Sequence, residues 1–246
     1  MTPRSATSSS RSRLWPRLVA LAVIAAVAFA AWQAITWPKV SALATRSPAS
    51  TAFIDRYRAL ERDAGRVPRV QWTWVPYGRV ATSLKRAVVV AEDASFFSHR
   101  GFATAEIREA IDKAVRDFGL PRGASTITQQ LAKNLWLSPS RNPLRKAKEA
   151  MLTWQLEKAL SKRRILELYL NVVEFGPGVY GAEAASRRYF GKPAAELTEE
   201  EAAQLAAGLP RPSIWHPGVR TIAYQRYVQD IRRRMERIAL PTRQLE

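Results

Sequence analysis

The chain has 246 residues, which is enough for one membrane anchor and one sizeable globular domain, and 47% of them are hydrophobic, as in a chain that buries a core. Its formal net charge of +18 favours an anionic partner, such as nucleic acid, an anionic lipid or a phosphate-bearing substrate. The chain has no cysteine, which excludes disulfides, thiolate metal sites and a cysteine nucleophile.

The N-terminal region combines a basic tail with an apolar run. Residues 1–17 are rich in serine and arginine and contain no acid, and residues 18–35 are interrupted only by Gln33. As a helix, these 18 residues would span about 27 Å, close to the ~30 Å hydrocarbon core of a bilayer. The alternative is a cleaved signal peptide, because residues 28–30 resemble a cleavage site. The length of the run favours an uncleaved anchor over residues 18–37, and the arginines before it predict an inside N-terminus.

The segment after the anchor contains a short helix and an extended stretch. Residues 38–69 are expected to form a linker and a membrane-proximal segment, and the apolar spacing over residues 53–63 predicts an amphipathic helix. Residues 70–78, VQWTWVPYG, alternate apolar and polar positions and then reach proline and glycine. This pattern indicates a strand or an extended segment that closes in a turn.

An apolar stretch then ends in two adjacent acids. Ser83 is a suitable N-cap for residues 84–93, LKRAVVVAED, but the three consecutive valines leave helix and strand both open. In either form the stretch ends in Glu92 and Asp93, where a helix dipole does not favour a carboxylate. The acidic pair is therefore either a solvated helix end or part of a functional site. His99, taken alone, is more often a structural histidine than a ligand or a base.

A second polar block follows an expected amphipathic helix over residues 103–118. The block GASTITQQLAKN, residues 123–134, places Ser125 and Thr126 at a helix start. Hydroxyls, free backbone N–H groups and the positive end of the helix dipole together form an anion-binding geometry. Four polar side chains continue along adjacent rows of the same helix: Gln129, Gln130, Lys133 and Asn134. The alternative is an ordinary capped helix with a polar face.

A second carboxylate lies among cations. Arg145 and Glu149 are four residues apart on a predicted helix, and Lys146 and Lys148 flank them. The simplest interpretation is a helical ion pair worth a few tenths of a kcal/mol. The functional interpretation is a carboxylate held ionised by cations beside a phosphate site.

The remainder of the chain is predicted to be helical. A helix follows residues 161–164 and is expected to end at the Gly-Pro-Gly of residues 176–178, and a helix of small residues covers residues 181–190. Thr198 and Glu201, three residues later, form a capping-box pattern before another helix. A last, strongly basic helix covers residues 224–238. Because helical patterns dominate and no internal repeat is visible, the expected class is mainly α.

Several of these blocks together resemble a known family. EDASFFSHRG, GASTITQQLAKN, RKAKE and KRRILELYLNVVEFGPGVYGAEAASRRYFGK resemble, in order and spacing, the signature blocks of the peptidoglycan glycosyltransferases, family 51. The similarity covers residues 70–217, with small departures at residues 136–138 and 140–141. It ends where bifunctional penicillin-binding proteins continue into a transpeptidase, so the chain resembles the monofunctional biosynthetic transglycosylases. The resemblance implies no role for the basic C-terminal helix in residues 218–246.

The resemblance implies a fold and a role for individual residues. The expected fold is a lysozyme-like glycosyltransferase domain over residues 70–217, with a single N-terminal transmembrane helix. Glu92 matches the general base that takes the proton from the 4-hydroxyl of the acceptor sugar, and Glu149 matches a second essential carboxylate beside the diphosphate. The residues that match substrate-binding positions are Asp93, Phe96, His99, Ser125, Thr126, Gln129, Gln130, Lys133, Asn134, Arg145, Lys146 and Lys162. A divalent cation, Mg²⁺ or Mn²⁺, is expected as the counter-charge of the substrate diphosphate, with no protein ligands identified.

We therefore expect an inverting hexosyltransferase of cell wall biogenesis, which also bears on cell shape. It would polymerise lipid II into β-1,4 glycan strands with release of undecaprenyl diphosphate. The expected partners are lipid II, the growing glycan strand, the membrane and proteins of the wall-synthesis machinery. The expected location is the inner membrane, crossed once, with the catalytic domain in the periplasm.

Two alternatives from other classes remain open. One is a lytic transglycosylase or muramidase, which also uses a catalytic glutamate on glycan but does not need cations around a diphosphate. The other is a non-catalytic membrane protein that binds anionic lipid. A nucleic-acid partner is disfavoured by the outward topology and by the lack of a base-stacking motif in the sequence.

Overall fold

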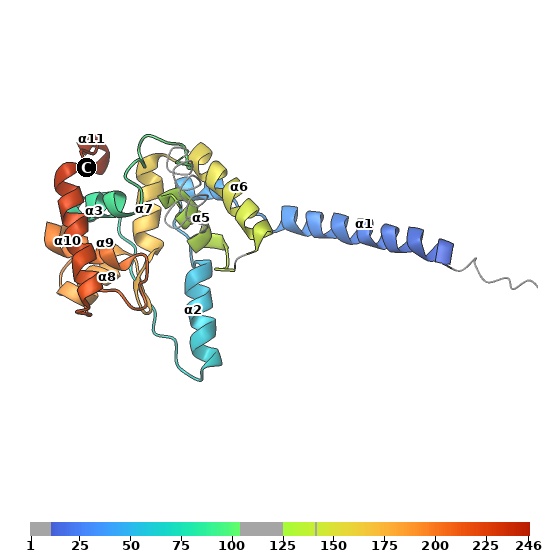
Figure 1. Ribbon diagram of the computed structural model, residues 1–246, viewed down its shortest axis with the longest axis horizontal. Coiled ribbons are helices and arrows are strands. Elements are labelled where there is room, and N and C mark those ends of the chain that lie inside the picture. The colour runs from blue at the N-terminus through green and yellow to red at the C-terminus, as the bar shows by residue number, and fades with distance from the viewer. Residues whose placement is uncertain (1–10, 104–124, 141) are drawn as a thin grey trace, which may run out of the picture. The chain divides into compact units, whose positions relative to one another are not determined.

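The computed structural model describes residues 11–103, 125–140 and 142–246 (Figure 1). The chain divides into two compact units, Met1–Lys39 and Val40–Glu246. Most of the helix expected over residues 103–118, the start of the polar block at residues 123–124 and much of the basic N-terminal tail lie outside the described residues.

The first unit contains the helix α1 (Arg11–Ile35), which has 25 residues. Its large apolar side chains are exposed, among them Leu21, Ile24 and Val27. Among the helices of the described residues, none has the length and hydropathy expected of a bilayer-spanning segment. The transmembrane anchor expected over residues 18–37 is therefore not confirmed.

The second unit is mainly helical, as predicted. Its α-helices are α2 (Ala52–Asp63), α3 (Thr82–Glu92), α5 (Ile127–Trp136), α6 (Pro143–Ala159), α7 (Lys162–Val172), α8 (Ala182–Phe190), α9 (Glu199–Gly208), α10 (Ile222–Arg237) and α11 (Thr242–Leu245). Among the described residues of the unit there are also three short 3-10 helices, η1 (Val40–Ala44), η2 (Tyr77–Arg79) and η3 (Ala194–Glu196). The strands are β1 (Gln71–Trp72), β2 (Glu174–Gly176) and β3 (Val179–Tyr180).

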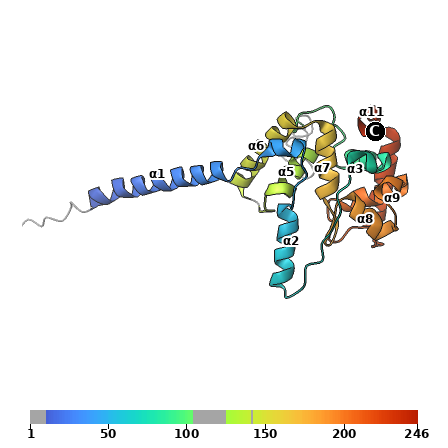
Figure 2. The ribbon, with the colours of Figure 1, turned by 180° about the vertical axis from the view of Figure 1, so that it is seen from behind.

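The helices of this unit pack in two groups around α7. α5 packs against α2, α6 and α7, while α3 packs against α9 and α10. Figures 1 and 2 show α2, α5 and α6 on one side of α7, and α3, α8, α9 and α10 on the other. The core is built from fully buried aliphatic side chains of these helices, such as Leu84, Val88, Ile127, Leu131 and Leu168. The two polar blocks of the sequence thus come from helices on both sides of α7.

The helix α3 resolves the ambiguity of the valine-rich stretch. Residues Val88, Val89 and Val90 are fully buried, and packing against α9 and α10 outweighs their modest helix propensity. The expected N-cap at Ser83 is wrong, because the helix begins two residues earlier than expected, at Thr82, with Ala81 in the cap position. The Ser83 hydroxyl instead donates to the carbonyl oxygen of Leu197 at 2.7 Å.

A small sheet replaces what the sequence indicated as a helix end. α7 ends at Val172, and in the Gly-Pro-Gly of residues 176–178 the last two residues form the turn between β2 and β3. Gly178 has φ 71°, and a Cβ there would lie 2.6 Å from the carbonyl oxygen of Arg69, so only glycine fits. β3 pairs with β2 in antiparallel and with β1 in parallel orientation, with Gln71 opposite Val179. Of residues 70–78, which were expected to form a strand or an extended segment, only Gln71 and Trp72 form a strand, β1.

Candidate active site

Glu92 is the last residue of α3, and a chain of hydrogen bonds holds its carboxylate. Gln130 Nε2 donates to Glu92 Oε2 at 2.7 Å, and the Tyr169 hydroxyl donates to Gln130 Oε1 at 2.9 Å. The tyrosine therefore orients the amide that contacts the acid. Burial raises the pKa of Glu92, while the Gln130 hydrogen bond and the positive charge of Lys133 act in the opposite direction. A half-buried carboxylate with a raised pKa is suited to accept a proton.

Asp93, the other member of the acidic pair, is a buried structural acceptor. It accepts hydrogen bonds from His99 Nε2 at 2.9 Å and from the backbone N–H of Ile127 at 3.0 Å. The backbone N–H of Gly101 donates to His99 Nδ1 at 3.0 Å, so the proton of a neutral His99 lies on Nε2. Asp93 therefore joins the loop after α3 to the N-terminus of α5, where a carboxylate complements the helix dipole.

The start of α5 uses its polar groups for capping. Thr126 is buried, and it forms a capping box with Gln129. The Thr126 hydroxyl also donates to the carbonyl oxygen of Gly101 at 2.8 Å. The side chains of Gln129, Asp93 and Thr126 thus accept from the backbone N–H groups of Thr126, Ile127 and Gln129, respectively, which could otherwise have bound an anion. Of the two hydroxyls, only that of Ser125 is exposed.

Glu149 on α6 forms the centre of a cationic cluster. Its side chain is 3% exposed; it accepts from Arg145 Nη1 at 2.6 Å and pairs with Lys146. The N-cap Asn142 and a proline at the helix start begin α6 one turn before these residues. Because a buried carboxylate needs paired charges, the two cations accompany Glu149 and are in turn fixed in position by it.

Lys133 on α5 links this cluster to Glu92. Burial lowers the pKa of Lys133, Glu149 and Glu92 raise it, and Arg145 and Lys146 lower it. Both carboxylates therefore act on the same half-buried amine, although they are far apart in the sequence. Three cations then act around one buried carboxylate, Glu149, so this side of the site carries excess positive charge. Asn134, one residue after Lys133, is buried.

Lys162 lies in a different environment from Lys133, Arg145 and Lys146. Its Nζ donates to Glu157 Oε1 at 2.8 Å and lies 4.4 Å from the centre of the ring of the buried Phe96. Glu157 also accepts from the Thr128 hydroxyl at 2.5 Å. The described contacts of Lys162 are thus with Glu157 and Phe96 rather than with Glu149.

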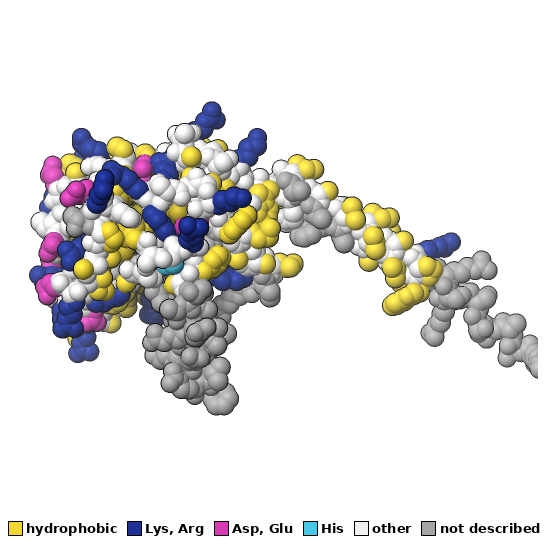
Figure 3. Space-filling model, turned by 90° about the horizontal axis from the view of Figure 1, so that it is seen from above, with side chains coloured by type: hydrophobic (Ala, Val, Ile, Leu, Met, Phe, Trp, Pro, Cys, Tyr) yellow, Lys and Arg dark blue, Asp and Glu magenta, His cyan; other side chains and the backbone are white. Residues whose placement is uncertain are grey.

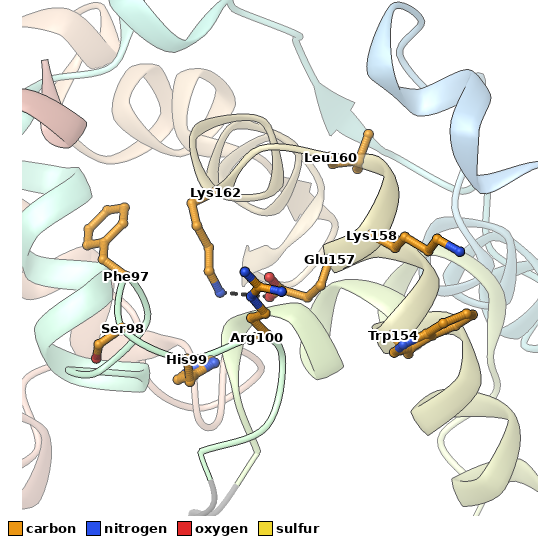
Figure 4. Close-up of a pocket in the computed structure, with 9 residues that line it drawn as sticks. All are labelled: Phe97, Ser98, His99, Arg100, Trp154, Glu157, Lys158, Leu160 and Lys162. Carbon is orange, nitrogen blue, oxygen red and sulfur yellow. Dashed lines mark hydrogen bonds and ion pairs between the residues drawn. The ribbon is translucent and has the colours of Figure 1, made fainter.

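A pocket of about 750 Å³ opens beside Lys162 and His99 (Figure 4). The loop after α3 lines one side of it, and the end of α6 lines the other with Trp154 and Lys158. On the face of the second unit shown in Figure 3, Lys and Arg side chains are spread widely, while acidic side chains gather mostly at one edge.

The helix α10 contributes to the surroundings of Glu92, which the sequence analysis missed. Burial raises the pKa of both Glu92 and Tyr227; the positive charge of Arg234 acts in the opposite direction on Glu92, and the negative charge of Glu92 adds to the rise at Tyr227. One signal was available: the apolar residues Tyr224, Val228, Ile231 and Met235 recur at helical spacing and are all buried. That stripe predicts that the helix packs against the domain, although it does not identify the partner.

The described residues offer little to a protein-bound metal ion. Within residues 11–103, 125–140 and 142–246, no group of three or more His, Asp or Glu side chains is arranged to hold one. Asp93 and Glu149 already accept contacts from protein donors. The residues described here therefore do not fit a dedicated metal site.

Comparison with known proteins identifies the family. A family model described as "Transglycosylase" matches residues 61–239. A "Biosynthetic peptidoglycan transglycosylase" from Thiobacillus denitrificans is 50% identical over 196 residues, which cover 79% of this chain and 84% of the relative.

Two further relatives carry the same name. The protein from Azoarcus sp. is 48% identical over 204 residues, covering 81% of this chain and 86% of its own. The protein from Bordetella avium is 39% identical over 239 residues, covering 95% of this chain and 100% of its own. The residues that the family model matches include all of α3, α5, α6, α7 and α10, and with them both carboxylates and the surrounding cations. The resemblance seen in the sequence blocks is thereby confirmed: the chain belongs to the transglycosylase family.

Proposed function

We propose that the chain is a peptidoglycan glycosyltransferase that polymerises lipid II into β-1,4 glycan strands and releases undecaprenyl diphosphate. One observation carries the mechanism: Glu92 and the cation-bound Glu149 act on the same half-buried amine, that of Lys133. A candidate base and a candidate diphosphate site therefore lie within electrostatic reach of each other. Family membership and the names of the relatives support the choice of substrate class.

Glu92 is assigned as the general base. The acceptor's 4-hydroxyl oxygen forms a bond to the anomeric carbon of the donor, the bond from that carbon to the diphosphate breaks, and the hydroxyl proton moves to the Glu92 carboxylate. The hydrogen bond from Gln130 to Oε2 fixes the orientation of the acid during this transfer. A positioned base of this kind contributes about 10²–10⁴-fold to a rate. Attack opposite the leaving group inverts an α-linked donor into a β-linked product, without a glycosyl-enzyme.

The cations of α5 and α6 are assigned to the leaving group. As the glycosidic bond breaks, negative charge grows on the diphosphate, so fixed positive charges stabilise the transition state more than the ground state. Arg145 can bind a phosphate with parallel hydrogen bonds, and its ion pair with Glu149 fixes the guanidinium before the substrate binds. Burial lowers the pKa of Lys133, and an arriving diphosphate would favour its charged form again.

The divalent cation is proposed to be carried by the substrate. The described side chains do not form a cage, so Mg²⁺ or Mn²⁺ would bind diphosphate oxygens and add counter-charge there. Ser125, Asn134 and Lys162 are proposed to line the path of the glycan or the diphosphate.

We also propose that the enzyme works at the inner membrane, with the catalytic domain in the periplasm. A lipid-linked substrate diffuses in the bilayer, and an enzyme that acts on it gains from being held there. The exposed apolar side chains of α1 and the net charge of +18 support attachment to an anionic membrane. Proteins of the wall-synthesis machinery are further proposed partners.

Purified full-length chain in detergent with labelled lipid II tests the assignment. We expect the wild type to form polymer and Glu92→Gln to form none, with the helical circular dichroism signal unchanged. Glu236→Gln, which removes an exposed carboxylate from α10, is the matched control and should polymerise normally. Near-normal turnover by Glu92→Gln would remove the base assignment. Fragments from finished sacculi in place of polymer would point to a lytic enzyme instead.

A further inference from the structure

A chain of hydrogen bonds joins three helices at the carboxylate of Glu92. Glu92 ends α3, Gln130 lies on α5 and Tyr169 lies on α7. α5 packs directly against α7, and Figures 1 and 2 show the two helices side by side. Gln130 lies 38 residues after Glu92 and 39 residues before Tyr169, so the fold, and not the local sequence, brings the three side chains together.

Tyr169 is the fixed end of this chain of hydrogen bonds. Its side chain is fully buried, and so are its neighbours Leu168 and Leu170. Because a protein core is close-packed, the fold sets the position of the phenol ring and of its hydroxyl. Burial raises the pKa of Tyr169 well above its ordinary value, and the charges of Glu92 and Asp93 add to the rise. The hydroxyl therefore keeps its proton and remains a donor.

The protein uses most of the hydrogen-bonding capacity of the Gln130 amide. The amide oxygen accepts from the Tyr169 hydroxyl at 2.9 Å. The amide nitrogen donates to Glu92 Oε2 at 2.7 Å and to the carbonyl oxygen of Ser125 at 3.4 Å. A glutamine side chain offers two donor hydrogens and two acceptor positions, so both donors and one acceptor position are occupied. Gln130, which the sequence grouped with the substrate-binding residues, thus has little capacity left for a substrate.

The two hydrogen bonds of the Gln130 side chain support each other. An ionised carboxylate only accepts, so the amide N–H faces Glu92 and the amide oxygen faces Tyr169. Gln130 is half-buried, and without a donor at its oxygen the amide could turn away from the acid. A hydrogen bond to the amide oxygen also polarises the amide and strengthens the bond that its N–H donates. The tyrosine hydroxyl therefore determines how firmly Gln130 holds Glu92.

We propose that Tyr169 is a positioning residue for the base: through Gln130, its hydroxyl holds the Glu92 carboxylate in the orientation that accepts the proton of the acceptor hydroxyl. The inference rests on the proposed function, because it requires Glu92 to be the base. The proton moves from the acceptor hydroxyl to Glu92, and neither Tyr169 nor Gln130 gains or loses one. Loss of the tyrosine hydroxyl therefore slows the chemical step and leaves substrate binding unchanged.

Steady-state polymerisation of labelled lipid II by the full chain in detergent tests the proposal. Tyr169→Phe removes only the hydroxyl. We expect its kcat to fall about 2- to 10-fold, the factor that one neutral hydrogen bond contributes, with KM unchanged. Tyr224→Phe is the matched control, because Tyr224 is also fully buried and its hydroxyl donates to the carbonyl oxygen of Gln204 on α9 at 2.8 Å. The control should lower Tm to a similar extent and leave kcat unchanged.

A double-mutant cycle distinguishes action through Gln130 from a general effect on packing. Gln130→Met removes the amide and keeps a side chain of similar length. It should lower kcat about 10- to 100-fold with KM unchanged, because a hydrogen bond to a charged group contributes more than a neutral one. In the Gln130→Met background, Tyr169→Phe should lower kcat no further. It should raise Tm there, since it removes a buried hydroxyl that has lost its acceptor.

Three results would overturn the inference. One is an unchanged kcat in Tyr169→Phe or in Gln130→Met, and the latter decides the question if Tyr169→Phe does not fold. Another is a fall in kcat on Tyr169→Phe that is equally large with and without Gln130, or that Tyr224→Phe reproduces, which would indicate a loss of packing. The third is a rise in KM in Gln130→Met with kcat retained, which would make Gln130 a substrate ligand. If the wild type polymerises lipid II and Glu92→Gln does not, the proposed function stands even when Tyr169 fails these tests.

Discussion

Glu92→Gln should make the protein more stable while it removes activity. Burial raises the pKa of Glu92 in the folded chain. A carboxyl whose folded pKa is raised contributes stability below its unfolded pKa, and this contribution is lost as the pH rises through the folded pKa. At neutral pH the ionised Glu92 is therefore a cost to folding, and a neutral glutamine removes it.

The size of the effect follows from the same linkage. Each unit by which the folded pKa is raised corresponds to about 1.4 kcal/mol. In a domain of this size, about 1 kcal/mol moves Tm by about 2–4 °C. The amide of Glu92→Gln can still accept from Gln130 Nε2, so the hydrogen bond is not lost with the charge. We expect a rise in Tm of a few degrees at neutral pH for each unit of the pKa shift.

Thermal unfolding of the full chain in detergent, followed by tryptophan fluorescence at neutral and acidic pH, measures this effect. The Tm difference between Glu92→Gln and wild type should be positive at neutral pH and vanish at acidic pH, where Glu92 is protonated in both folded and unfolded chains. The control Glu236→Gln should show no pH-dependent difference. A Glu92→Gln variant less stable than wild type at neutral pH would refute the burial argument, as would a difference that does not depend on pH.

Three further predictions concern the cations of the candidate site and the divalent ion. Lys133→Ala and Arg145→Ala should raise KM for lipid II more than they lower Tm, because both cations are assigned to the diphosphate; parallel losses of activity and Tm would indicate structural roles. Lys162→Met should lower the free energy of unfolding by about 1–3 kcal/mol in urea titrations, because it leaves the carboxylate of Glu157 without its cation; unchanged stability would show that this pair contributes nothing. Chelation of divalent cations with EDTA should slow polymerisation without changing Tm, since the ion is assigned to the substrate; a fall in Tm on chelation would reveal a metal site in the protein.

The elements of the fold that depend on local signals were predictable. Thr126 and Gln129 form a capping box, as do Thr198 and Glu201, and in each case the helix begins where the pattern indicates. The basic C-terminal helix was also expected, within two residues at its start. These features depend on contacts within one turn of helix, which a sequence displays directly.

Features that depend on distant contacts were not predictable in the same way. The valine run of α3 is helical because α9 and α10 bury it, and its own propensity leaves the choice open. The turn at Gly178 was taken for a helix end, since glycine and proline mark both. The strand after this turn pairs Val179 with Gln71, which lies more than a hundred residues earlier in the chain.

The same distinction applies to the candidate site. The contact between Arg145 and Glu149 follows from their spacing of four residues. The link from Glu149 to Glu92 through Lys133 needs the packing of α5 against α6 and was expected only from the family resemblance. Lys162, which the resemblance grouped with the diphosphate cations, has Glu157 as its partner. The roles of these residues in catalysis stay predictions.

The pH dependence of kcat/KM for wild-type chain acting on purified lipid II tests the assignment of Glu92 most directly. Because burial raises the pKa of Glu92, we predict that activity falls on the acidic side at a pH clearly above the usual range for a glutamate. A profile without an acidic limb, or with a limb at the ordinary pKa of an exposed carboxyl, would contradict the assignment of Glu92 as a buried general base.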